Sequence, residues 1–215
     1  MYFTKILIFL MAFIPTFAQA SATEIPKDWQ KQPHVQSFIA QMKQKHQLSE
    51  ESLGALFQQT EYKQSIIDAI SRPAEKTKTW GEYRPIFIHE KNIQQGVDFW
   101  KKNAVVLSRA EKNFGVPAEI ITAIIGVETR YGQNKGKYRV IDALATLAFF
   151  FPPREAFFKK ELEEFLLLSK EQHWDALTIK GSYAGAMGFG QFMPSSHRKW
   201  AVDFNQDQII DIINH

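Results

Sequence analysis

The feature that most restricts the fold of this chain is the spacing of its apolar residues by three and four positions. The spacing recurs in two separate stretches: Val35, Phe38, Ile39 and Met42, and later Val97, Trp100, Ala104 and Leu107. It places apolar side chains along one face of an α-helix. No stretch alternates apolar and polar residues for long enough to build a sheet. The sequence therefore predicts a mainly α fold.

The first twenty residues have the features of an export signal. Lys5 precedes an apolar run over positions 6–17, and Ala18-Gln19-Ala20 matches a small-residue cleavage site. A run of this length is too short to span a bilayer as a helix, which needs about 20 residues. We expect cleavage after Ala20 and no stable membrane insertion afterwards. A retained N-terminal anchor is the alternative.

The chain of 215 residues contains no cysteine. Disulfides are excluded, so stability must come from a buried core. A lipid anchor on cysteine is excluded as well, which favours a soluble, exported protein over a lipoprotein. The formal net charge is only +3. Nucleic-acid binding requires a concentrated basic face, so no nucleic-acid partner is expected.

The domain organisation follows from where the helical spacing stops and resumes. Residues 21–72 form the predicted N-terminal helical part, in which Ser49 starts a helix with an apolar face of Leu53, Leu56 and Phe57. Pro73, Gly81 and Pro85 interrupt the pattern, so 73–95 is predicted as an extended connection. Residues 96–215 are predicted as a larger core.

One helix of this core carries a glutamate in an unusual place. Pro117 suits a first helical turn and Gly132 suits a helix end. Glu128 follows Ile121 by seven positions and Ile124 by four, which predicts its carboxylate on the apolar face. Apolar surroundings disfavour the charged form, as a general acid near neutral pH requires. A structural ion pair is the alternative.

A glycine-rich segment over residues 181–195 is the second unusual feature. Its sequence, GSYAGAMGFGQFMPS, lacks the lysine and the preceding strand of phosphate-binding loops, which excludes nucleotide binding. The small residues allow the backbone to approach another element or a ligand closely. Ser182, Tyr183 and Gln191 offer hydrogen bonds beside aromatic surface, which suits a sugar. A close helix crossing without a ligand is the alternative.

Taken together, these segments resemble one protein family. The sequence GVETRYG, at positions 126–132, followed by GSYAGAMGFGQFMPSS, at 181–196, closely resembles the lytic murein transglycosylase B family. The resemblance extends to WGEYR at 80–84, GVDFW at 96–100, DALATL at 142–147, PPR at 152–154 and AVDF at 201–204. It therefore covers the chain from about position 30 to the end.

The resemblance implies a lysozyme-like, α-rich catalytic core with an additional N-terminal helical domain. It also implies periplasmic cell-wall turnover in a Gram-negative-type bacterium, with peptidoglycan glycan strands as the partner. The reaction is cleavage of the MurNAc–GlcNAc β-1,4 bond with formation of a 1,6-anhydromuramoyl end. Glu128 stands at the position of the family's single acid/base. A second acid at Asp142, Glu155 or Asp203 remains an alternative.

Further residues are assigned from their family positions alone. Ser182 and Gln191 occupy positions that line the sugar cleft, and Arg154 matches a cleft arginine able to meet a carboxylate or carbonyl. Tyr183 and Phe189 are aromatic there too, and serve either as core or as stacking surface. No cofactor is required by the reaction.

The family also carries an EF-hand-like calcium loop, and the resemblance places it at 203–214. Oxygen-bearing side chains occupy loop positions 1, 3, 5 and 9: Asp203, Asn205, Asp207 and Asp211. Gln208 replaces the turn glycine and Asn214 replaces the bidentate acid, so we expect a weakened structural calcium site. Family members continue well past this loop. We therefore expect a core that is incomplete at its C-terminus and poorly active alone.

Two other functions remain open. A peptidoglycan-binding module, inactive or truncated, would hold glycan without cutting it. A muramidase that hydrolyses with water would share Glu128 and differ only in its product. A metallopeptidase is excluded, because the six histidines are scattered and form no H-E-x-x-H helix.

Overall fold

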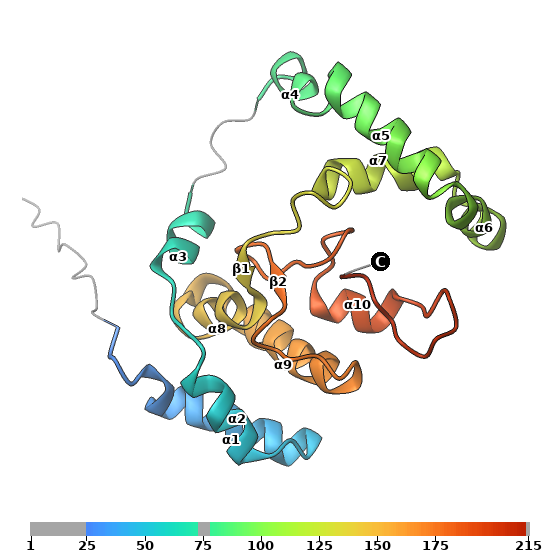
Figure 1. Ribbon diagram of the computed structural model, residues 1–215. Coiled ribbons are helices and arrows are strands. Elements are labelled where there is room, and N and C mark those ends of the chain that lie inside the picture. The colour runs from blue at the N-terminus through green and yellow to red at the C-terminus, as the bar shows by residue number, and fades with distance from the viewer. Residues whose placement is uncertain (1–24, 73–77, 214–215) are drawn as a thin grey trace, which may run out of the picture.

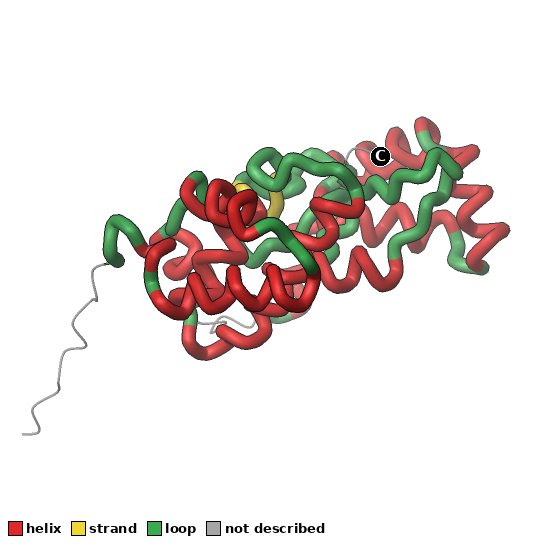
Figure 2. The backbone as a smooth tube through the Cα atoms, turned by 90° about the horizontal axis from the view of Figure 1, so that it is seen from below, coloured by secondary structure: helices red, strands yellow, loops and turns green. Residues whose placement is uncertain are grey.

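The computed structural model describes residues 25–72 and 78–213, so the predicted export signal lies outside the described residues. Helices dominate (Figure 2) and follow in the order η1 (Trp29–Lys31), α1 (Pro33–His46), α2 (Glu50–Gln58), α3 (Gln64–Ile70), α4 (Trp80–Phe87), α5 (Glu90–Lys102), α6 (Ala104–Phe114), α7 (Ala118–Thr129), α8 (Val140–Phe150), η2 (Pro152–Arg154), α9 (Glu155–Glu171) and α10 (Pro194–Trp200). Within the described ranges, no helix is both long and apolar enough to span a membrane.

The N-terminal helices form as their sequence predicts. The four apolar residues with helical spacing in α1 are all buried: Val35, Phe38, Ile39 and Met42. The hydroxyl of Ser49 accepts a hydrogen bond from the amide of Ser52 at 3.2 Å, which confirms Ser49 as the N-cap of α2. Leu53 and Phe57 of α2 are buried on the face that meets α1.

These helices do not form a core of their own. Trp29 packs against Phe149 of α8 with ring centroids 5.9 Å apart, and one buried cluster joins α1–α3 to α8 and α9. A buried carboxylate, Asp142 at the start of α8, accepts hydrogen bonds from Nε of Arg139 at 2.7 Å and from the amide of Glu61 at 2.9 Å. The predicted N-terminal part and α8–α9 are therefore one packed body.

Helices α4–α7 form an arm on the other side of α8 from α1 and α2 (Figure 1). The predicted extended connection over 73–95 is wrong from residue 80 onward, where α4 and the start of α5 lie. The reason is a capping box: Glu82 accepts hydrogen bonds from the amide and hydroxyl of Thr79 at 2.9 and 3.0 Å. This cap starts α4 in spite of Pro85. Residues 73–77 lie outside the described ranges.

Two glycines of the arm leave space for the side chain of Tyr131 between α5 and α7. A Cβ atom on Gly126 of α7 would lie 2.7 Å from the Tyr131 ring, and one on Gly96 of α5 would lie 2.6 Å from the Tyr131 hydroxyl oxygen. Tyr131 therefore fills the contact between α5 and α7. Burial raises the pKa of its phenol.

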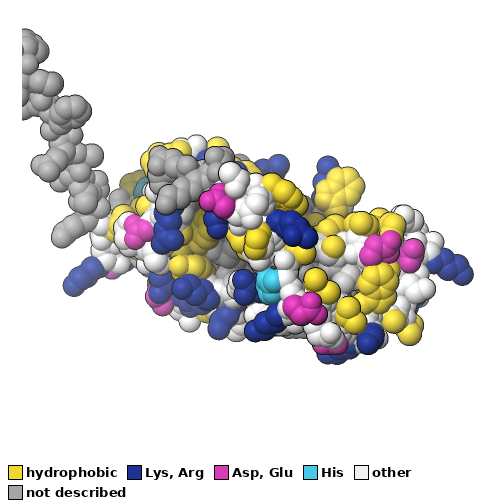
Figure 3. Space-filling view, turned by 90° about the horizontal axis from the view of Figure 1, so that it is seen from above, with side chains coloured by type: hydrophobic (Ala, Val, Ile, Leu, Met, Phe, Trp, Pro, Cys, Tyr) yellow, Lys and Arg dark blue, Asp and Glu magenta, His cyan; other side chains and the backbone are white. Residues whose placement is uncertain are grey.

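Much of the apolar surface of the arm is exposed. Yellow side chains gather over the α5–α6 side when the molecule is seen from above (Figure 3). The exposed large apolar residues of α5–α7 are Ile93, Val97, Trp100, Val105, Val106, Phe114, Ile120, Ile124 and Val127. A cavity of about 590 Å³ separates the arm from the C-terminal loop and is lined mainly by aromatic and aliphatic side chains.

Candidate active site

Helix α7 carries Glu128 at its C-terminal end. The helix begins after Pro117, its N-cap, and has Glu119 in its first turn, where the helix dipole favours an acid. Glu128 is the last residue but one of the helix. Its side chain is exposed and therefore accessible to a substrate.

The predicted burial of Glu128 among isoleucines is wrong. Ile124 on the same face is 53% exposed. The buried face of α7 instead consists of small residues: Ala118, Thr122, Gly126 and Thr129. Tyr131 folds back onto Gly126 and covers the small-residue face, whereas Ile120 and Ile124 stay exposed and Ile121 and Ile125 are half-buried. The candidate acid/base lies on an open surface of the described chain.

The turn that follows α7 consists of three consecutive residues with left-handed backbone angles. Arg130, Tyr131 and Gly132 have φ values of 49°, 60° and 84°. Left-handed angles are unfavourable for residues with a Cβ atom, and clusters of such residues are typical of functional sites. The turn ends α7 and places Gly132 in space against Phe189 of the glycine-rich segment.

The glycine-rich segment is a compact loop rather than a helix. It starts at strand β2 (Lys180–Gly181), which pairs antiparallel with β1 (Tyr138–Arg139). The backbone of Met187 then bridges both Gly181 and Phe192. The hydroxyl of Ser182 accepts hydrogen bonds from the amides of Ala184 at 3.2 Å and Ala186 at 3.1 Å. Ser182 therefore shapes the loop.

Two predicted site residues of this loop meet the turn that follows Glu128. Nε2 of Gln191 donates to the carbonyl of Gly188 at 3.0 Å and to that of Lys135 at 3.3 Å. The ammonium of Lys135 lies 4.6 Å from the centre of the Phe189 ring. The structure thus brings Phe189 and Gln191 against the segment that leaves α7. Tyr183, in the same loop, is 40% exposed.

Arg154 lies on a different element. It ends η2, is exposed, and its guanidinium stacks on Phe157 at 4.2 Å from the ring centre. Within the described residues, no hydrogen bond or ion pair joins Arg154 to Glu128 or to the glycine-rich loop. Its predicted role in the cleft stays a prediction.

The alternative second acids are engaged elsewhere. Asp142 is buried and bound to Arg139. Glu155 forms an ion pair with Lys159 within α9. Asp203 accepts hydrogen bonds from three backbone amides of its own loop. Each of the three carboxylates thus has a local structural role, which favours a site with one acid.

An aromatic pocket that the sequence did not predict lies between α4 and α7. Trp80, Tyr83 and Phe87 of α4 line a cavity of about 350 Å³ together with Val127, the residue that precedes Glu128. The ring centroids of Tyr83 and Phe87 are 5.1 Å apart. The WGEYR motif marked this region, but only the helical spacing of its aromatic residues could have placed them on one face.

The predicted calcium loop has the turn of such a site but an incomplete ligand set. Gln208, at the position of the turn glycine, has φ 72°, and Asp203 accepts its amide proton at 2.7 Å. Asn205 donates to Asp207 at 2.7 Å, while Asp211 accepts from the amide of Ile213. Over residues 25–72 and 78–213, no three acidic or histidine side chains converge as metal ligands. Asn214 lies outside the described residues.

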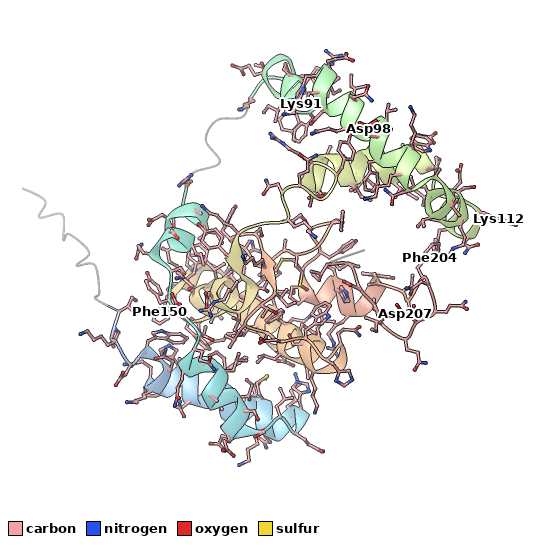
Figure 4. All side chains as sticks on the ribbon, in the orientation of Figure 1. Lys91, Asp98, Lys112, Phe150, Phe204 and Asp207 are labelled. Atoms are coloured by element: carbon pink, nitrogen blue, oxygen red, sulfur yellow. The ribbon has the colours of Figure 1, made fainter. Side chains whose placement is uncertain are left out.

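One residue of this loop, Phe204, contacts the arm. The guanidinium of Arg109, on α6, donates to the carbonyl of Phe204 at 2.7 Å and lies 4.0 Å from the centre of its ring. Figure 4 shows Phe204 at the end of the arm and Asp207 further along the loop. Phe114 of α6 also packs against Phe204, with ring centroids 6.0 Å apart, so Arg109 and Phe114 both hold the loop on the arm.

The chain is thus mainly helical, with an exposed glutamate near the end of α7 and a glycine-rich loop hydrogen-bonded to the same helix. The family model described as "Transglycosylase SLT domain" matches residues 30–215, and the chain belongs to that family. The predicted mainly α, lysozyme-like fold is confirmed.

Individual relatives are similar over most of this chain. The membrane-bound lytic murein transglycosylase B of Escherichia coli K12 is 41% identical over 203 residues, which are 90% of this chain and 56% of the relative. The soluble lytic transglycosylase SltB1 of Pseudomonas aeruginosa is 58% identical, with a TM-score of 0.84 over 85% of this chain and 62% of its own. E. coli Slt35 is 43% identical, with a TM-score of 0.82 over 87% and 60%. The chain thus spans less than two thirds of these relatives.

Proposed function

We propose that this chain carries the catalytic centre of a lytic transglycosylase that cleaves the MurNAc–GlcNAc β-1,4 bond of peptidoglycan. The observation that supports it most directly is one exposed glutamate, Glu128, near the end of α7, with the glycine-rich loop hydrogen-bonded to the next residue, Thr129, and to Lys135 beyond the turn. The similar proteins include lytic transglycosylases. The structure of one similar protein, SltB3 of P. aeruginosa, which is 27% identical, was solved in complex with NAG-anhNAM-pentapeptide.

In the proposed reaction Glu128 acts twice. Its carboxyl group first gives a proton to the glycosidic oxygen as the bond to the muramoyl anomeric carbon breaks. The carboxylate then accepts the proton of the muramoyl C6 hydroxyl, whose oxygen bonds to that carbon and closes the 1,6-anhydro ring. Glycosidases with two carboxylates keep them about 5–9.5 Å apart. An internal hydroxyl needs only one, which agrees with the local roles of Asp142, Glu155 and Asp203.

The aromatic pocket supplies a surface for sugar rings. Trp80 is 67% exposed and Tyr83 is 45% exposed, and both lie on α4 beside α7, the helix that carries Glu128. Aromatic faces with a polar edge suit pyranose rings, which have an apolar face and a rim of hydroxyl groups. Ser182 and Gln191 are proposed to border the glycan, and Arg154 to meet an acidic group of the substrate.

The test is digestion of purified murein sacculi by residues 21–215, with the soluble products identified by mass spectrometry. Anhydromuropeptides are expected from the unmodified chain and not from Glu128→Gln. The matched control is Glu119→Gln, an exposed glutamate in the first turn of the same helix. Products with reducing ends would indicate a muramidase instead. Sacculus binding without any release would indicate a glycan-binding module.

Export to the periplasm belongs to the same proposal. Cleavage after Ala20 would release a soluble protein that reaches peptidoglycan. Expression of the full chain in a Gram-negative host, followed by fractionation and N-terminal sequencing, tests it. A periplasmic product that begins at Ser21 is expected. A membrane-bound product with the original N-terminus would mean a retained anchor.

We further propose that the reaction needs no cofactor and that the loop at 203–214 binds calcium only weakly. Slt35, the similar E. coli protein, was solved in complex with calcium. Here Gln208 and Asn214 replace the turn glycine and the bidentate acid, so a dissociation constant of about 1 mM is expected. Calcium titration of the thermal midpoint, with Asp203→Asn as control, tests it. A midpoint that rises at micromolar calcium would contradict the proposal.

A further inference from the structure

The residue after Glu128 makes a contact that the sequence did not reveal. Thr129 is 1% exposed, and its hydroxyl oxygen lies 3.0 Å from the carbonyl oxygen of Phe189. The same oxygen lies 3.1 Å from the carbonyl of Ile125 and accepts a hydrogen bond from the amide of Gly132 at 2.9 Å. The single hydroxyl proton is therefore shared between α7 and a loop sixty residues later in the chain.

This contact joins the catalytic helix to the glycine-rich loop. Over the described residues, no other hydrogen bond connects α7 directly to residues 181–193. The next connection passes through Lys135, beyond the left-handed turn. The Thr129 hydroxyl is therefore the direct hydrogen bond between the end of α7 and the loop, next to the packing of Gly132 against the Phe189 ring.

Thr129 also stabilises the turn that makes the approach possible. Gly132, at φ 84°, donates its amide proton to the Thr129 hydroxyl. An amide shielded from water without a partner is unfavourable, so this bond compensates part of the cost of three left-handed residues in a row. Loss of the hydroxyl would release both ends of the contact: the Gly132 amide and the Phe189 carbonyl.

We propose that Thr129 is a positioning residue for Glu128, and this inference rests on the proposed function. Its hydroxyl holds the end of α7 against Phe189 and thereby sets the carboxylate of Glu128 relative to the sugar bordered by Ser182 and Gln191. Proton transfer requires hydrogen-bond reach, and a displacement of about 1 Å can reduce a rate by about 100-fold. Thr129 itself touches no reacting atom.

The experiment compares three variants of the full chain on murein sacculi. Thr129→Val removes the hydroxyl at nearly constant volume, whereas Thr129→Ser keeps it. Thr122→Val is the matched control, because Thr122 is buried in the same helix and its hydroxyl donates only within the helix, to Ala118 at 2.8 Å. Thr129→Val is expected to lower kcat by about 10- to 100-fold with KM within about two-fold. Thr129→Ser and Thr122→Val should keep kcat within about three-fold.

Amide hydrogen exchange gives a readout that does not need activity. Exchange at Gly132 should become faster in Thr129→Val and stay unchanged in Thr122→Val. Equal kcat in the two valine variants would overturn the positioning role, and so would a rise in KM alone. If the unmodified chain releases no product, the proposed function fails and the positioning role fails with it. Unchanged exchange at Gly132 would overturn the contact itself.

Discussion

Gly132 lies directly against the ring of Phe189: a Cβ atom on Gly132 would come within 2.1 Å of Cε1 of that ring. The backbone at Gly132 is also left-handed, with φ 84°. Two independent constraints thus exclude a side chain at the point where the turn after α7 meets the glycine-rich loop. The glycine makes the close approach of these two segments possible.

Gly132→Ala is therefore expected to destabilise the protein. The left-handed backbone alone costs about 1–2 kcal/mol for a residue with a Cβ atom, and displacement of the Phe189 ring adds to it. We expect a loss of at least about 2 kcal/mol in the free energy of unfolding, measured with urea. Gly54→Ala is the control, because Gly54 lies in α2 with open space around it. It should gain about 0.5–1 kcal/mol. Equal effects would contradict the prediction.

Asp142→Asn tests the joint between the N-terminal helices and α8. The change removes the charge that Arg139 pairs with, and leaves a half-buried guanidinium with weaker acceptors. We expect a loss of about 2–3 kcal/mol in the free energy of unfolding. Glu50→Gln breaks an exposed pair with Lys43, which solvent screens, and should have a much smaller effect on this free energy. A small effect of Asp142→Asn would mean that these contacts of Asp142 contribute little to the free energy of unfolding.

His197 predicts a dependence of stability on pH. Burial lowers the pKa of its imidazole, while the backbone of Ile210 and the charges of Asp211 and Glu171 act in the opposite direction. In the unfolded chain the His197 imidazole therefore binds a proton near pH 6.5, whereas in the folded chain it binds one only at a lower pH. Stability from this group is present above about pH 6.5 and falls as the pH is lowered towards the folded pKa.

Urea unfolding at pH 7.5 and pH 5.0 measures this loss. His197→Gln should lose less stability over this interval than the unmodified chain. If His197→Gln and the unmodified chain respond alike, another group must account for the pH dependence.

Arg109→Gln tests how the C-terminal loop is held. The change removes a hydrogen bond and a cation–ring contact to Phe204, and should raise the open population of the loop about five-fold, as a loss of about 1 kcal/mol implies. Limited digestion with chymotrypsin, which cuts after Phe204, measures it. Lys112→Gln, on an exposed position of the same helix, serves as the comparison. Similar digestion rates for both variants would show that Arg109 does not fix the loop.

The sequence predicted those features that depend on local spacing. The buried face of α1 and the cap at Ser49 follow from neighbouring residues, so the structure confirms both. The burial of Glu128 is predicted from its own helix alone and is wrong, because the face of α7 that packs is the small-residue face, with Gly126 against the Tyr131 ring. The capping box at Thr79 was overlooked among the prolines and glycine of the connection.

Contacts between distant segments could not be predicted from periodicity. Thr129 and Phe189 are brought together by a turn of three left-handed residues, and two of these, Arg130 and Tyr131, have side chains that usually avoid such angles. The resemblance to a family placed Ser182 and Gln191 near the site, but their hydrogen bonds within the protein became visible only in the structure.

The shared core of α1–α3 with α8 and α9 has a consequence for how the protein folds. Helices α4–α7 are inserted in sequence between the two halves of that core, so Trp29 meets Phe149 only after the whole arm has been made. The arm is built from neighbouring helices and can form early, whereas the core must close a long loop first. A chain interrupted within the arm would expose Phe38 and Phe57 without a partner from α8, and aggregation is the expected fate of such an intermediate.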